Sequence, residues 1–132
     1  MIVSFRVGVS AVALGTALML FAGCGKSSSV ERYELSGKMT FHGAPVPVGV
    51  ILFEPAKGNG GPGAMAEIHD GEYRTPPGKG TVGGPHIARI TAGDGKNVSP
   101  LAPYGGYLGK GETRLEIDIP RENSSKDLDI PQ

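Results

Sequence analysis

Cys24 is the only cysteine of the 132-residue chain, and its surroundings favour one covalent chemistry. It follows the small residues Ala22 and Gly23, which end a run without charge that begins after Arg6. A charged start, an apolar stretch and small residues before a cut form the pattern of a secretory signal peptide. The position of the thiol predicts cleavage before Cys24, a diacylglycerol thioether on its sulfur and an amide-linked acyl chain such as palmitate on its nitrogen. Two or more acyl chains give stable membrane anchoring, so we predict lipidated Cys24 as the mature N-terminus.

One position of this cleavage signal is unusual, and one alternative stays open. Phe21 occupies the position three before the cysteine, where bacterial lipoproteins most often have leucine, which here is Leu20. The alternative is an uncleaved membrane helix, because residues 7–25 are nineteen uncharged residues and roughly 18 to 20 suffice to span a bilayer. Gly25 stands where an aspartate would favour inner-membrane retention in some bacteria. The expected location is therefore extracytoplasmic and lipid-anchored, at the outer membrane or the cell surface.

The three histidines, His42, His69 and His86, supply the right number of protein ligands for a catalytic zinc. Their spacing does not bring them together: His42 lies on the polar face of a predicted strand, His69 flanks a turn and His86 begins a later strand. We interpret all three as solvated surface residues. We predict no metal site and no cofactor.

Two further motifs imitate known sites without their structural context. Residues 78–83 (GKGTVG) fit the dinucleotide fingerprint, but they follow two prolines and precede an extended segment, so no helix N-terminus could receive a pyrophosphate. Residues 94–97 (DGKN) lack the alternating oxygen ligands of a calcium loop. The first motif is interpreted as a mobile loop and the second as a turn.

Tyr104 and Tyr107, separated by two glycines, are the candidate recognition residues, because rings on a glycine-rich loop can stack on a sugar or anchor a partner. The alternative is that one or both fold back over an end of the domain. The chain has no Gly-x-Ser-x-Gly or His-Glu-x-x-His motif and no carboxylate spacing typical of an acid and base pair. We predict a protein without catalytic residues.

The elements that must position these residues are strands. Polar and apolar residues alternate along 33–42 and 115–119, residues 48–53 are a continuous apolar run, and Asp70-Gly71 is a strong hairpin signal. Seven strands are predicted, at residues 33–42, 48–53, 64–69, 72–75, 85–92, 112–119 and 126–130. Residues 93–111 are expected to be irregular. No stretch has helical periodicity, so we predict an all-β, antiparallel seven-stranded sandwich, with an antiparallel barrel as the main competitor.

Composition limits the domain organisation and the partners. The 13 basic and 13 acidic residues leave no basic field for nucleic acid, and one cysteine permits no internal disulfide. The 22 glycines and 11 prolines separate strands rather than form a repeat. We divide the chain into a signal peptide (1–23), lipidated Cys24 with a short tether (24–30) and one β domain (31–132), which is one domain's worth of chain.

These segments together resemble a family. The residues that carry the resemblance are 37–41 (GKMTF), 43–46 (GAPV), 51–55 (ILFEP), 71–73 (GEY), 84–86 (GPH), 89–91 (RIT), 115–120 (LEIDIP) and 127–131 (DLDIP). They are similar to small planctomycete-type lipoproteins with a carboxypeptidase-regulatory-like domain. The resemblance implies a transthyretin-like or immunoglobulin-like sandwich that is not catalytic. The expected function is a membrane-anchored structural or interaction module of the cell envelope, the alternative being a carbohydrate- or peptide-binding module that uses residues 93–111.

Overall fold

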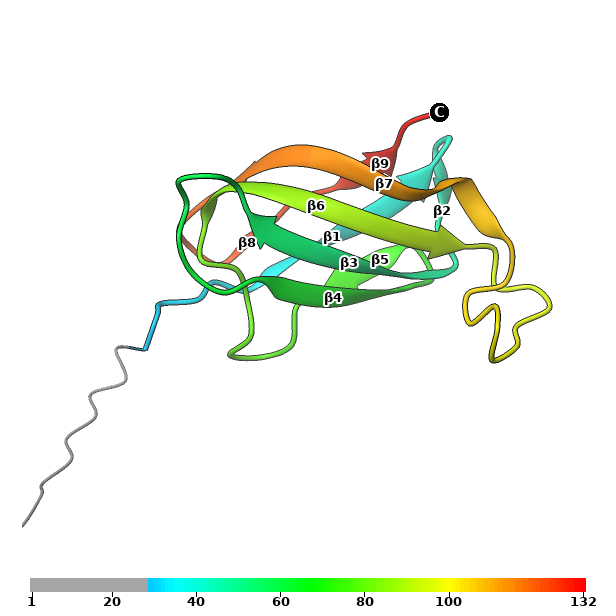
Figure 1. The fold of residues 1–132 in the computed structure, drawn as a ribbon, viewed down its shortest axis with the longest axis horizontal. Coiled ribbons are helices and arrows are strands. Elements are labelled where there is room, and N and C mark those ends of the chain that lie inside the picture. The colour runs from blue at the N-terminus through cyan, green and yellow to red at the C-terminus, as the bar shows by residue number, and fades with distance from the viewer. Residues whose placement is uncertain (1–28) are drawn as a thin grey trace, which may run out of the picture.

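The computed structural model describes residues 29–132, so the signal peptide, Cys24 and most of the tether lie outside the described residues. Nine strands and no helix occur between residues 29 and 132 (Figure 1). The strands are β1 (Leu35–Phe41), β2 (Ala44–Pro45), β3 (Val48–Pro55), β4 (Ala64–His69), β5 (Glu72–Arg74), β6 (Gly84–Gly93), β7 (Tyr107–Ile119), β8 (Ser124–Ser125) and β9 (Leu128–Ile130).

All nine strands belong to one sheet, in the order β2-β1-β5-β4-β3-β6-β7, with β8 and β9 paired to β1. The sheet curls into a half-barrel around the core (Figure 1). The all-β prediction is confirmed, but two facing sheets are not found. The reason lies in β1, which pairs with β5 and β2 along one edge and with β8 and β9 along the other, and so joins into one sheet the strands that a sandwich would divide.

The two-residue sequence period decides which side chains enter the concave face. Leu35 and Met39 on β1, Ile51 and Phe53 on β3 and Ile90 on β6 have no exposed surface. Successive side chains of a strand point to opposite faces, so the polar residues between them face solvent. The remaining buried apolar residues of the core are Val46, Ala66, Ile68, Tyr73, Ala88, Ala92, Ile119, Leu128 and Ile130.

Two short turns set the strand register at one end of the sheet. Asp70 and Gly71 have φ angles of 50° and 78°, the left-handed pair that a two-residue hairpin turn needs, and they place Ile68 opposite Tyr73 as predicted. The second turn lies between β1 and β2. His42 and Gly43, with φ of 51° and 76°, form it, and β2 already pairs with β1.

The C-terminal segment departs most from the predicted antiparallel arrangement. β8 and β9 both run parallel to β1, with Leu35 opposite Ser124 and Met39 opposite Leu128. Side chains extend this edge: the Asn123 Oδ1 accepts the Glu34 N–H at 2.9 Å, and the Asp127 Oδ1 accepts the Lys38 N–H at 2.9 Å. The last residues of the chain thus complete the backbone bonding of the first strand.

Tyr73 stabilises the contact between β1 and the C-terminal segment from the core side. Its side chain is 3% exposed, its ring lies 5.9 Å from that of Phe53, and its hydroxyl donates to the Lys126 carbonyl. Burial, together with the nearby Asp127 carboxylate, raises the pKa of the Tyr73 phenol. Gly37 leaves the space for this contact, because a Cβ there would lie 2.0 Å from the Lys126 oxygen and 3.1 Å from the Tyr73 ring.

We predict that Gly37→Ala destabilises the fold by about 1 to 3 kcal/mol, the usual cost of forcing atoms into a filled space. The backbone of Lys126 must move to admit the methyl group, which weakens the Tyr73 bond and the C-terminal strands. Urea denaturation measures the change. Gly60→Ala is the matched control, since no atom lies within 4 Å of its Cβ position and its φ is not left-handed. Equal stability of the two variants would refute the role of Gly37.

Candidate binding loop

The loop between β6 and β7 is organised by one carboxylate. The Asp94 Oδ1 accepts the N–H groups of Lys96 at 2.8 Å and Gly106 at 2.9 Å, which joins the two ends of the loop. The backbone reinforces this closure, because the Asp94 N–H donates to the Gly106 carbonyl and the Gly95 N–H donates to the Tyr104 carbonyl. The two N–H bonds to its carboxylate lower the pKa of Asp94. In place of the predicted turn at residues 94–97, the Asp94 side chain bonds to the Lys96 N–H and the backbone bends at Asn97.

The loop needs glycine where its first and last residues pass close to each other. A Cβ on Gly105 would lie 2.4 Å from the Lys96 oxygen, and one on Gly93 would lie 2.0 Å from the Tyr104 oxygen. Gly95, Asn97 and Gly105 all have left-handed φ angles, between 53° and 77°. Residues 94–106 therefore form a folded loop with internal bonds of its own, which sequence reasoning described only as irregular.

The tip of this loop exposes apolar side chains. Val98 is 59% exposed and Leu101 is 96% exposed. Reciprocal backbone bonds between Ser99 and Ala102, at 3.0 and 3.1 Å, hold the turn from which Leu101 projects. Neither aliphatic residue was among the predicted site residues. The signal that could have identified them is two apolar residues in a segment otherwise rich in glycine, proline and polar residues.

The two predicted tyrosines take different positions. Tyr107 is the first residue of β7, pairs with Gly93 and is 60% exposed. Tyr104 folds back and, with Val48, Val50 and Met65, lines a hollow of about 220 Å³ on the outer face of the sheet. The alternative of one tyrosine covering the domain is therefore correct for Tyr104, and Tyr107 alone keeps an exposed ring beside the loop. The expected irregular segment is also shorter, because β7 begins at residue 107 rather than 112.

The histidines are separated, as the spacing indicates, but one is not at the surface. The His42 Nδ1 lies 3.0 Å from the Gln132 side chain, and the His69 Nε2 lies 3.1 Å from a Glu67 carboxylate oxygen. His86 is 1% exposed, so its interpretation as a solvated residue is wrong. Its Nδ1 lies 2.9 Å from the Gly84 carbonyl, and it faces the core because β6 places every second residue there. Within residues 29–132 no cluster of three metal-ligating side chains occurs.

The glycine-rich segment 78–83 also differs from its interpretation as a mobile loop. Thr81, Val82 and Gly83 are buried, and Thr81 exchanges two backbone bonds with Tyr33 at 2.7 and 2.9 Å. A Cβ on Gly80 would lie 1.9 Å from the Tyr33 oxygen. The second half of this segment is thus packed against the chain that enters β1, which leaves no room for a nucleotide there.

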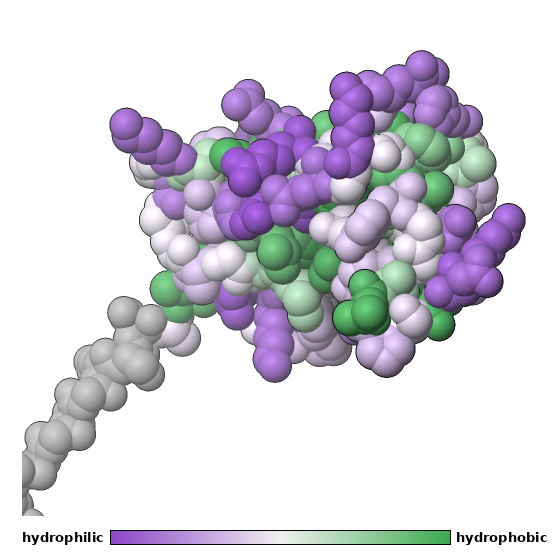
Figure 2. Space-filling view, turned by 45° about the vertical axis from the view of Figure 1, so that its right-hand side comes forward, coloured by the Kyte–Doolittle hydropathy of each residue, from purple (hydrophilic) through white to green (hydrophobic). Residues whose placement is uncertain are grey.

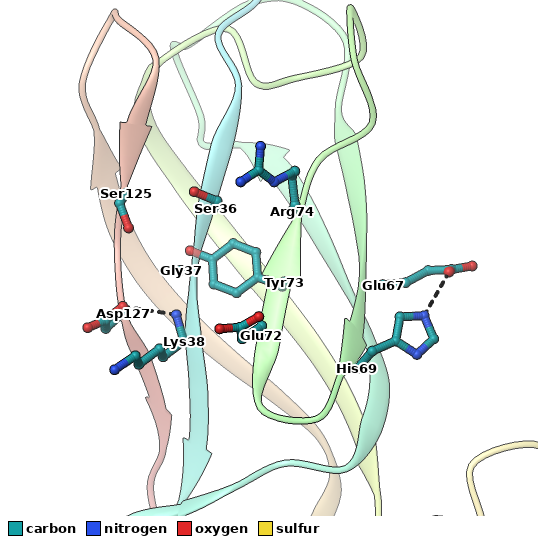
Figure 3. A pocket seen from close by; sticks show the side chains of 10 residues that line it. All are labelled: Ser36, Gly37, Lys38, Glu67, His69, Glu72, Tyr73, Arg74, Ser125 and Asp127. Carbon is teal, nitrogen blue, oxygen red and sulfur yellow. Dashed lines mark hydrogen bonds and ion pairs between the residues drawn. The ribbon is translucent and has the colours of Figure 1, made fainter.

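A polar groove of about 630 Å³ crosses β1, β5 and β4 on the outer face (Figure 3). Its walls carry both signs of charge, from Lys38 and Arg74 and from Glu67, Glu72 and Asp127. Some of these groups already serve the sheet, since Asp127 caps the Lys38 N–H and Glu67 pairs with His69. The Glu67 and His69 side chains are 71% and 69% exposed, so this groove is a solvated surface without a buried reactive group.

No protein-family model, curated protein or solved structure matches the chain. Residues 29–132 contain no helix of the length and apolarity that crossing a membrane requires.

We predict that Asp94→Ala opens the loop locally. The Lys96 and Gly106 amides lose their acceptor, so their hydrogen exchange accelerates by roughly fivefold, the equivalent of one net hydrogen bond. Asp94→Asn keeps an acceptor oxygen and serves as the control. Since the folded-state pKa is lowered, the wild-type closure is complete above the unfolded carboxyl pKa of about 3.9 and is lost as the pH falls through the folded value. Unchanged exchange in the alanine variant would contradict this role.

Proposed function

We propose that the chain is an extracytoplasmic, lipid-anchored and non-catalytic module of the cell envelope that presents the 94–106 loop to a partner. The observation that carries the proposal is the placement of two features along the long axis of the domain. The chain enters the sheet at one end, before β1, while the 94–106 loop projects from the opposite end (Figure 1). A lipid on Cys24 would therefore direct the loop away from the membrane.

The short distance between the predicted anchor and the sheet supports this arrangement. Tyr33 is already fixed by its pairing with Thr81, and Arg32 Nη2 donates to the Gly63 carbonyl at 2.6 Å. Only eight residues separate Cys24 from Arg32, which is at most roughly 27 Å of extended chain. A tether of this length keeps the entry end of the domain near the lipid surface.

The partner that the loop fits best is an apolar peptide or protein surface. Val98, Leu101 and Tyr107 are the exposed large apolar residues at this end, and the two aliphatic ones, which form the tip, offer no ring on which a sugar can stack. Closure by Asp94 reduces the conformational entropy that binding would cost, which favours a binding loop. This choice favours the peptide-binding over the carbohydrate-binding alternative.

We also propose that the domain is a relative of the carboxypeptidase-regulatory-like, transthyretin-like domains of small lipoproteins. Three of the segments that carry the resemblance, at residues 37–41, 51–55 and 71–73, lie mainly in β1, β3 and β5 of the same sheet. This placement supports a shared arrangement of strands, which in this chain form one continuous sheet instead of the two sheets of a sandwich.

We predict that Cys24→Ser abolishes incorporation of an alkyne-labelled fatty acid in a bacterial host and releases the protein from membranes washed at alkaline pH. Serine has no thiol to carry a thioether, whereas the rest of the signal is intact. Phe21→Leu restores the usual residue of the cleavage signal and is the control, with labelling equal to or above wild type. A Cys24→Ser protein that is still labelled would overturn the anchoring proposal.

We predict that peptides selected against the immobilised protein from a displayed library lose affinity by roughly tenfold or more when Leu101 is replaced by serine, as expected for a central apolar anchor. Val30→Ser is the control, because Val30 is also apolar and 50% exposed but lies in the segment that enters the sheet before β1, at the opposite end. Equal binding by both variants and wild type would exclude the loop as the recognition surface.

A further inference from the structure

The outer face of the sheet carries a second apolar surface at the end where the chain enters. It is a hollow of about 430 Å³, here named the entry hollow, lined by Arg32, Leu52, Ala64, Met65, Pro76 and Lys79 together with Phe53, Glu54 and Gly63. Leu52 is 36% exposed and Met65 is 49% exposed. Figure 2 shows apolar side chains at the surface of one face, bordered by hydrophilic ones. Phe53 is buried beneath the hollow, and Leu52 and Met65 are only partly covered by the rest of residues 29–132.

β3 explains why this surface is apolar. Ile51 and Phe53 enter the core, while the intervening Val50 and Leu52 face outward beside Met65, which pairs with Leu52 across the sheet. A strand that is apolar on both faces is typical of a sheet covered on both sides. β3 is thus buried on one face only; on its other face Leu52 lines the entry hollow, whereas Val48 and Val50 line the hollow beside Tyr104.

Some of the charged side chains around the entry hollow have an ion-pair partner, and others have none. Glu54 is neutralised by Arg89, whose Nη1 lies 2.7 Å from the Glu54 Oε1, and Arg89 also holds Glu112 at 2.7 Å. Among residues 29–132 Arg32 and Lys79 take part in no ion pair. The rim therefore combines two uncompensated cations with an apolar floor, which matches the anionic phosphates and the apolar region below them at a phospholipid surface.

We propose that the entry hollow docks on the headgroup layer of the membrane to which Cys24 is attached, with Arg32 and Lys79 on lipid phosphates and Leu52 and Met65 against the upper acyl region. The inference rests on the proposed anchoring. Its second support is position, because Arg32 itself lines the hollow and follows Cys24 by only eight residues. Val30, in the same entering segment, is 50% exposed and adds apolar surface at this end.

Docking fixes the orientation of the domain, which a flexible lipid tether alone does not. The outer face then turns toward the membrane at the entry end, and the 94–106 loop lies at the far end of the long axis (Figure 1). The hollow is shallow and the apolar area is small, so docking is a local equilibrium that depends on the anchor rather than an independent mode of membrane binding.

The test uses the lipidated mature protein in vesicles of phosphatidylcholine with phosphatidylglycerol, after flotation has shown that the protein is anchored. Because Cys24 is the only cysteine and its thiol is blocked by lipid, Met65→Cys introduces the single free thiol for an environment-sensitive fluorophore. Lipids with a nitroxide in the headgroup should quench this probe. The same probe at Leu101→Cys, at the opposite end, should not be quenched.

The charge contribution is tested in the Met65→Cys background. Lys79→Gln should lower the ratio of docked to undocked protein by roughly fivefold, the effect of one cation near an anionic surface. Lys96→Gln, in the distal loop, is the matched control and should change nothing. The same quenching in vesicles without anionic lipid should be weaker.

Three results would overturn docking. The first is quenching at residue 65 that is no greater than at residue 101, and the second is unchanged quenching in the Lys79→Gln variant. The third is a probe at residue 65 that becomes shielded from water as the protein density rises and not as the anionic lipid content rises. This third result would assign the hollow to a second copy of the chain. Failure of the anchoring proposal is a separate result, because the protein would then not float with vesicles at all.

Discussion

The contact of Tyr73 with the Lys126 carbonyl is the constraint on which the rest of the sheet depends. It joins β5 to the C-terminal segment across β1, and it exists only because Gly37 has no side chain at the crossing. β1 is thereby held on both edges by segments about forty and ninety residues away in the sequence. Without this junction the parallel strands β8 and β9 would contribute only five residues of pairing, too little for independent stability.

The junction also explains why the two functional surfaces lie where they do. Fixing β1 fixes the point at which the chain enters the sheet, and the Tyr33 and Thr81 pairing extends that fixed region toward the tether. β6 and β7 are the longest strands and carry the 94–106 loop at the other end. Their length, rather than the loop itself, separates the loop from the entry hollow. The paired strands β6 and β7 thus act as a spacer between the end where the chain enters and the end that carries the loop.

The sequence predicts the elements well and their partners less well. The strands predicted at residues 33–42, 64–69 and 85–92 match β1, β4 and β6 to within two residues at each end, and Asp70-Gly71 specifies a hairpin because left-handed backbone closes a two-residue turn. The same alternation does not say which strand is the neighbour, so the parallel pairing of β9 with β1 and the single curled sheet were not predicted. His86 lies in phase with the buried Ala88 and Ile90, and its interpretation as solvated used its place at the start of the strand instead of this alternation.

In the 94–106 loop, too, contacts between near neighbours can be predicted from the sequence and contacts between distant residues cannot. Asp94 is recognisable as a turn residue because its carboxylate bonds to the amide two residues later, but its second bond, to Gly106, joins residues twelve positions apart. That second bond joins the two ends of the loop, while the bonds between Ser99 and Ala102 hold the turn at Leu101. Apolar side chains that stay at the surface of the loop gain none of the roughly 25 cal/mol for each Å² that burial gives. Val98 and Leu101 therefore add little to the folding of the domain, and their burial is left to the contact proposed for the loop.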